Sequence, residues 1–183
     1  MGKTLTADVI QTRCKTEKLA NIKNLNLWGN DLEDISIIKE MPNIEICSLS
    51  LNKISSLKDF GHLKKLAELY LRKNAITDLS EAKHLQNCPN LKVLWLQDNI
   101  IAEHPLYRQY IIKLMPNLVK LDSAPVTQEE RNECIKLNIT EQDIKSSAPH
   151  HPEESYQQEK PKTTVSRERG KSPSVQSTHS TPS

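Results

Sequence analysis

The sequence lacks the features that mark membrane-spanning and secreted proteins. It has no apolar run near the roughly 18 residues that cross a bilayer, and residues 1–8 lack the apolar core of a signal peptide. Its four cysteines are scattered and form no C-x-x-C pair of the kind that binds zinc. These absences predict an intracellular protein with reduced cysteines in the cytoplasm or nucleus. The cysteines are Cys14, Cys47, Cys88 and Cys134.

Catalytic and metal-binding patterns are also lacking. The six histidines, at positions 62, 84, 104, 150, 151 and 179, do not stand at a readable spacing from a carboxylate or a cysteine. The sequence therefore predicts a protein that is not an enzyme and that needs neither a cofactor nor a metal.

Four copies of one apolar phrase are present. Each copy reads Ile/Leu-x-x-Leu/Cys-x-Leu-x-x-Asn-x-Leu/Ile, and successive asparagines lie 22, 22 and 25 residues apart. This is the leucine-rich-repeat pattern, in which each unit places one short strand beside the previous one. A half-copy, Leu118-x-x-Leu121, closes the series. The asparagines are Asn30, Asn52, Asn74 and Asn99.

The pattern assigns a place to each part of a repeat. In x-Leu-x-Leu-x the leucines alternate, so they point into the core while the x positions face outward. The asparagine follows where the chain leaves the sheet, and its amide can satisfy buried backbone donors and acceptors there. We therefore interpret the asparagine ladder as structural rather than catalytic. The segments 31–41, 53–63 and 75–88 carry apolar residues near helical spacing and predict short helical or 3₁₀ pieces on the other side.

Both ends of the repeat array should be capped, because a terminal repeat exposes a strand edge. Residues 6–18 predict a helix with Val9, Ile10 and Cys14 on its apolar side. Pro105 predicts the first turn of a second helix, and Thr127-x-x-Glu130 is a capping box that opens a third. The expected class is α/β, a leucine-rich-repeat solenoid. Its expected parts are an N-terminal helical cap (1–20), four repeats (21–104), a C-terminal cap (105–138) and a disordered tail rich in Ser, Thr and Pro (139–183).

The tail is predicted to be disordered because of its composition. Residues 145–183 contain no Leu, Ile, Phe or Trp and are rich in Ser, Thr, Pro, Gln and Lys. Such a segment cannot bury enough apolar surface to offset the loss of chain entropy. Ser172 and Thr181 each precede a proline and are candidate phosphorylation sites. Gly2 fits the short N-myristoylation pattern, although we favour an unmodified N-terminus.

The repeat register also predicts which residues form the exposed face of the sheet, which we call the sheet face and which is the concave face of such a solenoid. Counting back two, four and six residues from each asparagine gives twelve positions. The chain has one phenylalanine, two tryptophans and four tyrosines, and three of these aromatics fall among the twelve. Tyr and Trp are enriched at interface hot spots, so we predict a partner-binding surface; the alternative is that they cover the sheet by stacking on one another. The predicted binding residues are Trp28, Ile46, Ser48, Glu68, Tyr70, Arg72, Val93, Trp95 and Gln97.

Charge on the sheet face argues against nucleic acid. The face carries Glu68, Arg72, Lys120 and Asp122, which are two charges of each sign. A protein that grips a phosphate backbone would show a basic stripe. We therefore expect protein partners and no direct contact with nucleic acid.

Three phrases carry a resemblance to a known family. Leu25-Asn26-Leu27-Trp28-Gly29, Glu68-Leu69-Tyr70-Leu71-Arg72 and Val93-Leu94-Trp95-Leu96 are similar to those of the cilia- and flagella-associated protein 410 family, over roughly residues 5–137. That resemblance implies a basal-body and ciliary protein needed for cilium formation and cell shape, with a NIMA-related kinase among its partners. It also implies a small oligomerising helical module near the C-terminus, which this sequence does not show.

A second family remains as an alternative. The segment from Tyr107 to Glu130 resembles the C-terminal cap shared by the U2 small nuclear ribonucleoprotein A-prime subunit and axonemal dynein light chain. An A-prime-like protein would assemble a ribonucleoprotein by binding a helix of an RNA-binding partner. The sequence lacks an acidic tail and matches the first family at Trp28, Tyr70 and Trp95, so we favour the ciliary interpretation.

Overall fold

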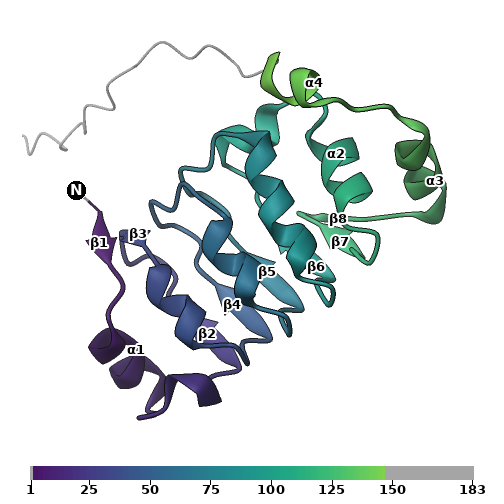
Figure 1. Cartoon of the computed structure of the whole chain (residues 1–183). Coiled ribbons are helices and arrows are strands. Elements are labelled where there is room, and N and C mark those ends of the chain that lie inside the picture. Colours follow the sequence, from purple (N-terminus) through teal and green to yellow (C-terminus); the bar gives the residue numbers. More distant parts are fainter. Residues whose placement is uncertain (1, 147–183) are drawn as a thin grey trace, which may run out of the picture. The chain divides into compact units, whose positions relative to one another are not determined.

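A computed structural model describes residues 2–146 of the chain. One sheet runs through the repeats, with parallel strands joined to one antiparallel strand at its C-terminal end (Figure 1). In order these strands are β2 (Asn24–Asn26), β4 (Ile46–Ser48), β5 (Glu68–Tyr70), β6 (Val93–Trp95), β7 (Lys120–Leu121) and the antiparallel β8 (Ala124–Pro125). A second, two-stranded sheet pairs β1 (Lys3–Thr4) with β3 (Leu32–Asp34) at the N-terminal end.

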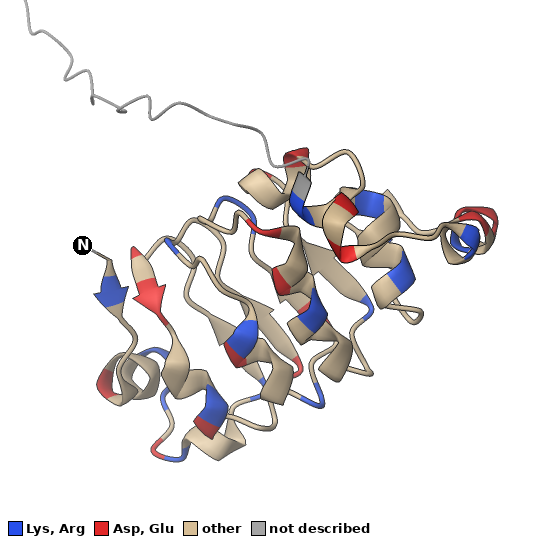
Figure 2. Cartoon of the chain, turned by 45° about the horizontal axis from the view of Figure 1, so that its top comes forward, with Lys and Arg blue, Asp and Glu red and all other residues tan. Residues whose placement is uncertain are grey.

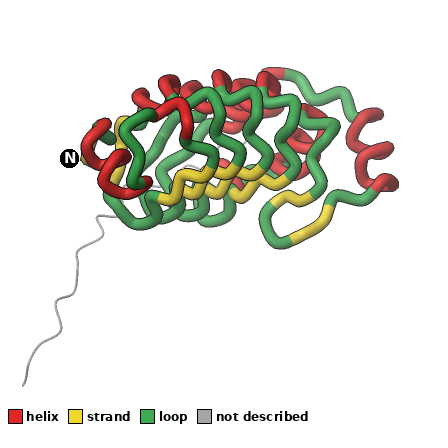
Figure 3. Tube along the Cα trace, turned by 90° about the horizontal axis from the view of Figure 1, so that it is seen from below, coloured by secondary structure: helices red, strands yellow, loops and turns green. Residues whose placement is uncertain are grey.

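Short helices line the side of the solenoid opposite the sheet, as Figure 3 shows. In the repeats these are 3₁₀-helices, as the sequence predicted for the segments after each asparagine. They are η2 (Ser36–Glu40), η3 (Lys58–His62), η4 (Leu79–Asn87) and η5 (Ile100–Glu103). The ends add α1 (Ala7–Cys14), η1 (Leu19–Asn21), α2 (Tyr107–Leu114), α3 (Gln128–Lys136) and α4 (Glu141–Ser146). The predicted leucine-rich-repeat solenoid is confirmed.

The strand register is the one that the repeat phrase predicted. Equivalent residues of successive repeats are directly paired, so that Cys47 lies between Leu25 and Leu69, and Leu94 follows. Each of these side chains is at most 1% exposed. One repeat therefore covers the next, and the core runs the length of the array because a single repeat has no partner surface of its own.

The asparagine ladder joins each repeat to the one before it. The Asn52 amide oxygen accepts from the backbone N–H of Leu32 at 2.9 Å, and its nitrogen donates to the carbonyl of Leu27 at 3.0 Å. Asn74 and Asn99 make the same kind of bonds to their own and the preceding repeat. These buried backbone groups would otherwise lack partners, so the side chain is required structurally.

Asn30 differs from the other three because it has no preceding repeat. Its nitrogen donates to the carbonyl of Trp28 at 2.9 Å, within its own turn. In all four turns the residue before the asparagine has a positive φ, which favours glycine. The first turn uses Gly29, while the others hold Leu51, Lys73 and Asp98 in that conformation.

A second ladder of asparagines, which the sequence analysis missed, lies at the other end of the strands. Asn43 donates to the carbonyl of Ala20, Asn90 to that of Lys64 and Asn117 to that of Pro89, at 2.7–3.0 Å. Each of the three asparagines follows a proline, at positions 42, 89 and 116, and this recurrent Pro-Asn pair was the available signal.

The N-terminal cap corrects the expected helix. Helix α1 ends at Cys14, because Lys15 adopts a left-handed conformation, and does not extend to residue 18. Of the residues assigned to the apolar side, Ile10 is buried and Cys14 packs partly buried against the core, whereas Val9 is 44% exposed. Thr6 occupies the N-cap position, yet its hydroxyl makes no capping hydrogen bond among the described residues.

The start of the second helix was also predicted wrongly. Helix α2 begins at Tyr107, two residues after Pro105. The N-cap residue is Leu106, and no side chain of the described residues caps the helix; the buried His104 instead holds the preceding turn, since its Nδ1 accepts from the backbone N–H of Leu106 at 3.0 Å. Pro105 therefore lies in the turn before the helix and not in its first turn.

Asp122, the residue after β7, takes the place of a longer strand beside the end of β6. Within the repeats, backbone N–H groups such as that of Leu71 donate to the next strand, in that case to the carbonyl of Trp95. At the last full repeat the carboxylate of Asp122 accepts instead from the N–H groups of Leu96 and Gln97, at 2.7 and 2.8 Å. Its second oxygen accepts from the Tyr107 hydroxyl at 2.9 Å. Burial, together with the charge and the hydrogen bond of the Asp122 carboxylate, raises the pKa of Tyr107.

Helix α3 starts at the predicted capping box. The Thr127 hydroxyl accepts from the Glu130 N–H at 3.2 Å. The Glu130 carboxylate forms a two-pronged contact with the Arg108 guanidinium of α2. That hydrogen-bonded contact, with a smaller part from the Thr127 backbone, lowers the pKa of Glu130.

The structure corrects the expected start of the tail. Residues 141–146, which the sequence analysis assigned to the disordered segment, form α4. Ile144 is 3% exposed within the core and Ile139 packs against it, while Lys83 of η4 contacts Glu141. The apolar surface of these two isoleucines is enough to hold the short helix α4 against the core that the repeats form. The remainder of the expected tail lies outside the described residues.

We predict that Leu71→Ala lowers the free energy of unfolding by about 2–5 kcal/mol, because it empties a fully buried position in the middle of the array. Urea unfolding of the full chain measures this. Arg72→Ala is the matched control, because its side chain is 54% exposed and should change stability by less than about 1 kcal/mol. Equal effects of the two substitutions would show that the register is wrong.

We further predict that Asp122→Gly lowers the free energy of unfolding by about 2–4 kcal/mol, because two backbone N–H groups after β6 lose their acceptor. Glycine is chosen because residue 122 has a φ of 53°, where alanine would add strain. Asp122→Asn, which keeps an acceptor oxygen, should lose less than half as much. A glycine variant as stable as the wild type would contradict the capping role of the carboxylate.

Candidate functional site

The sheet face consists of three rows that run across the strands. One row is Asn24, Ile46, Glu68, Val93 and Lys120, and the next is Asn26, Ser48, Tyr70 and Trp95. The third row lies two residues further along in each repeat and consists of Trp28, Ser50, Arg72 and Gln97. The structure thus places all nine predicted binding residues at the register positions expected for the exposed side of the sheet. Whether they bind a partner remains a prediction.

Tyr70 and Trp95 form a cluster on neighbouring strands. Their ring centroids are 6.1 Å apart with the planes tilted by 38°, and the Lys120 ammonium lies 5.5 Å from the Trp95 ring. The Trp95 Nε1 atom is buried and has no hydrogen-bond partner among the residues that the structure describes. Tyr70, Trp95 and Lys120 are all half-buried, so the cluster presents part of each side chain to solvent.

Glu68 fixes the orientation of Tyr70. The Tyr70 hydroxyl donates to the Glu68 carboxylate at 2.6 Å. This hydrogen bond, with partial burial and the carboxylate charge, raises the pKa of Tyr70 to about 12. The phenol is neutral at physiological pH, and its hydroxyl is already used by Glu68. A partner would therefore meet an oriented aromatic edge.

Trp28 does not join that cluster. It lies just beyond β2, and β2 is separated from β5 by β4, which places the two positions roughly 10 Å apart across the sheet. Its side chain is 58% exposed, the largest exposure of a sheet-face aromatic. The three aromatics that the sequence analysis grouped are thus two separate features, a tyrosine–tryptophan cluster in the middle and a single exposed tryptophan at the first strand.

Most of the charge on this face is locally paired. Glu68 binds Tyr70, Arg72 pairs with Asp98 at 2.7 Å and Lys120 lies over Trp95. The sequence analysis counted Asp122 as an open residue of this face; that was wrong, because its carboxylate accepts backbone N–H groups after β6. Figure 2 shows acidic and basic residues interspersed over the repeats, without a stripe of one sign.

A metal site requires a cluster of ligands, and a membrane-spanning helix requires a long apolar run. Within residues 2–146 no group of three or more His, Cys, Asp or Glu side chains is placed to hold a metal ion, and no helix of that part is long and apolar enough to cross a membrane. Cys47 and Cys88 are buried, and burial raises the pKa of their thiols to about 12 and about 11. Such thiols are unreactive core residues.

A model of the leucine-rich-repeat family matches residues 17–147 of the chain. The chain belongs to the leucine-rich-repeat family. Its buried leucines, its 3₁₀ connections and its asparagine ladder are the structural counterparts of that match.

Individual proteins are also similar to this chain in sequence. Cilia- and flagella-associated protein 410 from Mus musculus is 40% identical over 148 residues, which are 80% of this chain and 58% of the relative. The U2 small nuclear ribonucleoprotein A′ from Mycosarcoma maydis is 30% identical over 119 residues, 64% of this chain and 48% of the relative. The resemblance to the first protein, expected from the sequence, is confirmed. The chain spans little more than half of the mouse relative's length.

Among solved structures, the chain resembles one from the crystal structure of the Drosophila melanogaster SNF/U2A′ complex. The TM-score is 0.63 over 80% of each chain, at 21% sequence identity. At that identity the likeness shows the fold alone.

Three predicted features remain untested. Ser172 and Thr181, the candidate phosphorylation sites, lie outside the described residues. Gly2 lies against Glu33, whose carboxylate accepts from its backbone N–H at 2.7 Å, and this contact does not decide whether the residue is acylated.

We predict that Glu68→Gln lowers the pKa of Tyr70 from about 12 towards its ordinary value near 10, because the phenolate would no longer face a carboxylate. A titration of near-ultraviolet absorbance, with Tyr70→Phe subtracted, isolates this group. Glu45→Gln is the control, since the Glu45 carboxylate pairs with Lys23. An unchanged pKa in Glu68→Gln would show that the hydrogen bond does not orient the ring.

Proposed function

We propose that this leucine-rich-repeat protein is a non-enzymatic scaffold that acts in cilium assembly or maintenance at the basal body. The proposal includes a cytoplasmic and cytoskeletal location. The similarity to cilia- and flagella-associated protein 410 supports the ciliary part. That support comes from the relative's name and from the part of it that the chain covers, so the process is inferred by likeness.

The scaffold binds its partners through the sheet face. The observation that carries this is the tyrosine–tryptophan cluster at the centre of the face, where Glu68 and Lys120 hold the two rings in place. A rigid aromatic surface gains contact area on binding while losing little side-chain entropy. The mixed and paired charges favour a protein surface over a nucleic-acid backbone as the partner.

A protein kinase of the NIMA-related class is among the proposed partners, on the strength of the family resemblance. The second candidate is a ribonucleoprotein-assembly subunit, in which the sheet face would receive a helix of an RNA-binding protein. The likeness to the Mycosarcoma maydis U2 protein supports it.

Proximity labelling in a ciliated cell tests the proposal. We expect the wild-type chain to label basal-body proteins, including a NIMA-related kinase, and the triple variant Trp28→Ala, Tyr70→Ala, Trp95→Ala to lose them. The matched control replaces three exposed apolar side chains outside the sheet face, Val119, Ile135 and Leu137, by alanine; these are 57%, 64% and 40% exposed. Urea unfolding must first show that each variant is folded.

Each outcome has a distinct meaning. Enrichment of spliceosomal proteins instead of basal-body proteins would favour the second candidate. An unchanged ciliary list from the triple variant would reject the sheet face as the binding surface. Because Trp28 is separate from the other two aromatics, Trp28→Ala and the Tyr70→Ala, Trp95→Ala pair, tested apart, show which part of the face the partner uses.

A further inference from the structure

The first strand of the main sheet has an open edge. In the next repeat the backbone of β4 bonds to the repeat before it. The Ile46 N–H donates to the Lys23 carbonyl at 3.0 Å, and the Ser48 carbonyl accepts from the Leu27 N–H at 2.9 Å. The residues that correspond to Ile46 and Ser48 in β2 are Asn24 and Asn26. Among the described residues no strand pairs with β2 on this side, since β1 pairs with β3 instead (Figure 1).

Side-chain amides occupy only part of this edge. Asn26 Oδ1 accepts from the backbone N–H of Trp28 at 3.3 Å, and Asn30 Nδ2 donates to the carbonyl of Trp28 at 2.9 Å. These two amides take the place of a neighbouring strand at Trp28. The backbone groups of Asn24 and Asn26 that point to the edge have no such substitute within the described part of the chain. An exposed edge of this kind is a template for one more strand.

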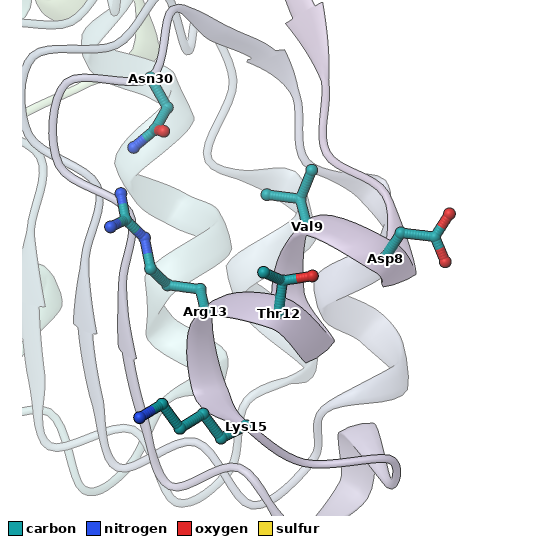
Figure 4. Close-up of a pocket in the computed structure, with 6 residues that line it drawn as sticks. All are labelled: Asp8, Val9, Thr12, Arg13, Lys15 and Asn30. Carbon is teal, nitrogen blue, oxygen red and sulfur yellow. The ribbon is translucent and has the colours of Figure 1, made fainter.

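The open edge is bordered by two hollows. A hollow of about 490 Å³ is lined by Arg13, Cys14, Asn24, Asn26 and Trp28. A second hollow of about 630 Å³ shares Arg13 and includes Lys15 and Asn30. In Figure 4 the Arg13 side chain extends from α1 towards Asn30, and Arg13 lines both hollows. Space, unpaired backbone and an exposed indole therefore coincide.

The charge beside this edge is positive. The segment 13–23 contains Arg13, Lys15, Lys18 and Lys23 against one carboxylate, Glu17. Lys23 pairs with Glu45 at 3.0 Å, whereas Arg13 and Lys15 form no ion pair with another described residue. Asp8, at the far side of the second hollow, is the acidic group among its lining residues. Two copies of this edge would repel each other, which disfavours a second copy of the chain as the occupant.

We propose that the free edge of β2 binds an extended acidic segment of a protein partner, which adds to the sheet as a further strand. Its backbone pairs with Asn24 and Asn26, its carboxylates pair with Arg13 and Lys15, and one of its side chains packs on Trp28. Backbone pairing supplies affinity, while the cations select an acidic sequence. This site is separate from the Tyr70–Trp95 cluster and does not depend on the proposed ciliary role.

Peptide selection tests the proposal without a known partner. A phage-displayed library of random dodecapeptides is selected on the full chain, and the same library is counter-selected on the variant Arg13→Glu, Lys15→Glu. We expect enrichment of peptides in which acidic residues alternate with β-branched or aromatic ones. We expect the double variant to bind a synthetic copy of an enriched peptide at least about tenfold more weakly. The Lys136→Glu, Lys145→Glu variant, altered far along the chain, is the charge control.

Two further measurements separate strand addition from simple charge attraction. The peptide should slow hydrogen exchange at the amides of Asn24 and Asn26, and leave exchange at Tyr70 and Trp95 unchanged. A copy of the peptide N-methylated at alternate positions, which keeps every charge but cannot form the ladder, should lose binding. Circular dichroism confirms that the variants are folded.

Several results would overturn the proposal. One is a library that yields no peptide preferring the wild-type chain over the double variant. Others are full binding by the N-methylated peptide, protection elsewhere on the surface, or a concentration-dependent dimer that protects the same amides without peptide. The last result would assign the edge to a second copy of the chain.

Discussion

The structure depends on hydrogen bonding between repeats at the turn that follows each strand. A repeat of this length cannot bury its apolar side alone, and the backbone of its turn cannot satisfy itself. The amide of Asn52 meets both requirements. It bonds to a backbone carbonyl of its own repeat and to a backbone N–H and a carbonyl of the repeat before it. With a net contribution of about 1 kcal/mol per bond, and a larger cost when a buried group is left unpaired, each amide fixes the spacing of two repeats.

The same requirement explains the two ends of the array. Near the C-terminal end the Asp122 carboxylate accepts the N–H bonds that a longer strand would have accepted, and Tyr107 holds it there. At the N-terminal edge the amides of Asn26 and Asn30 substitute only around Trp28. A half-buried carboxylate therefore satisfies the backbone near one end, and the other end retains backbone able to pair. This asymmetry gives the molecule two different kinds of surface for partners.

The sheet face is ordered by interactions of its own residues. Glu68 binds the Tyr70 hydroxyl, and Lys120 covers the Trp95 ring, so the rings are held before any partner arrives. Covering the sheet and binding a partner are thus compatible roles for Tyr70 and Trp95. Trp28 is not held in this way, and its large exposed area is best understood together with the open edge beside it.

The sequence by itself determined the strand register, the buried leucines and the asparagine ladder, because these follow from a short repeated pattern in which each position has one environment. It did not determine the ends, where contacts between distant segments replace the pattern. Asp122 was assigned to the open face, Pro105 to a helix start and residues 141–146 to the tail. In the fold the Asp122 carboxylate accepts backbone N–H groups after β6, Pro105 lies in a turn that His104 holds, and Ile144 enters the core. Only the tertiary structure decided these, since a side chain that substitutes for a missing neighbour has no periodic signal in the sequence.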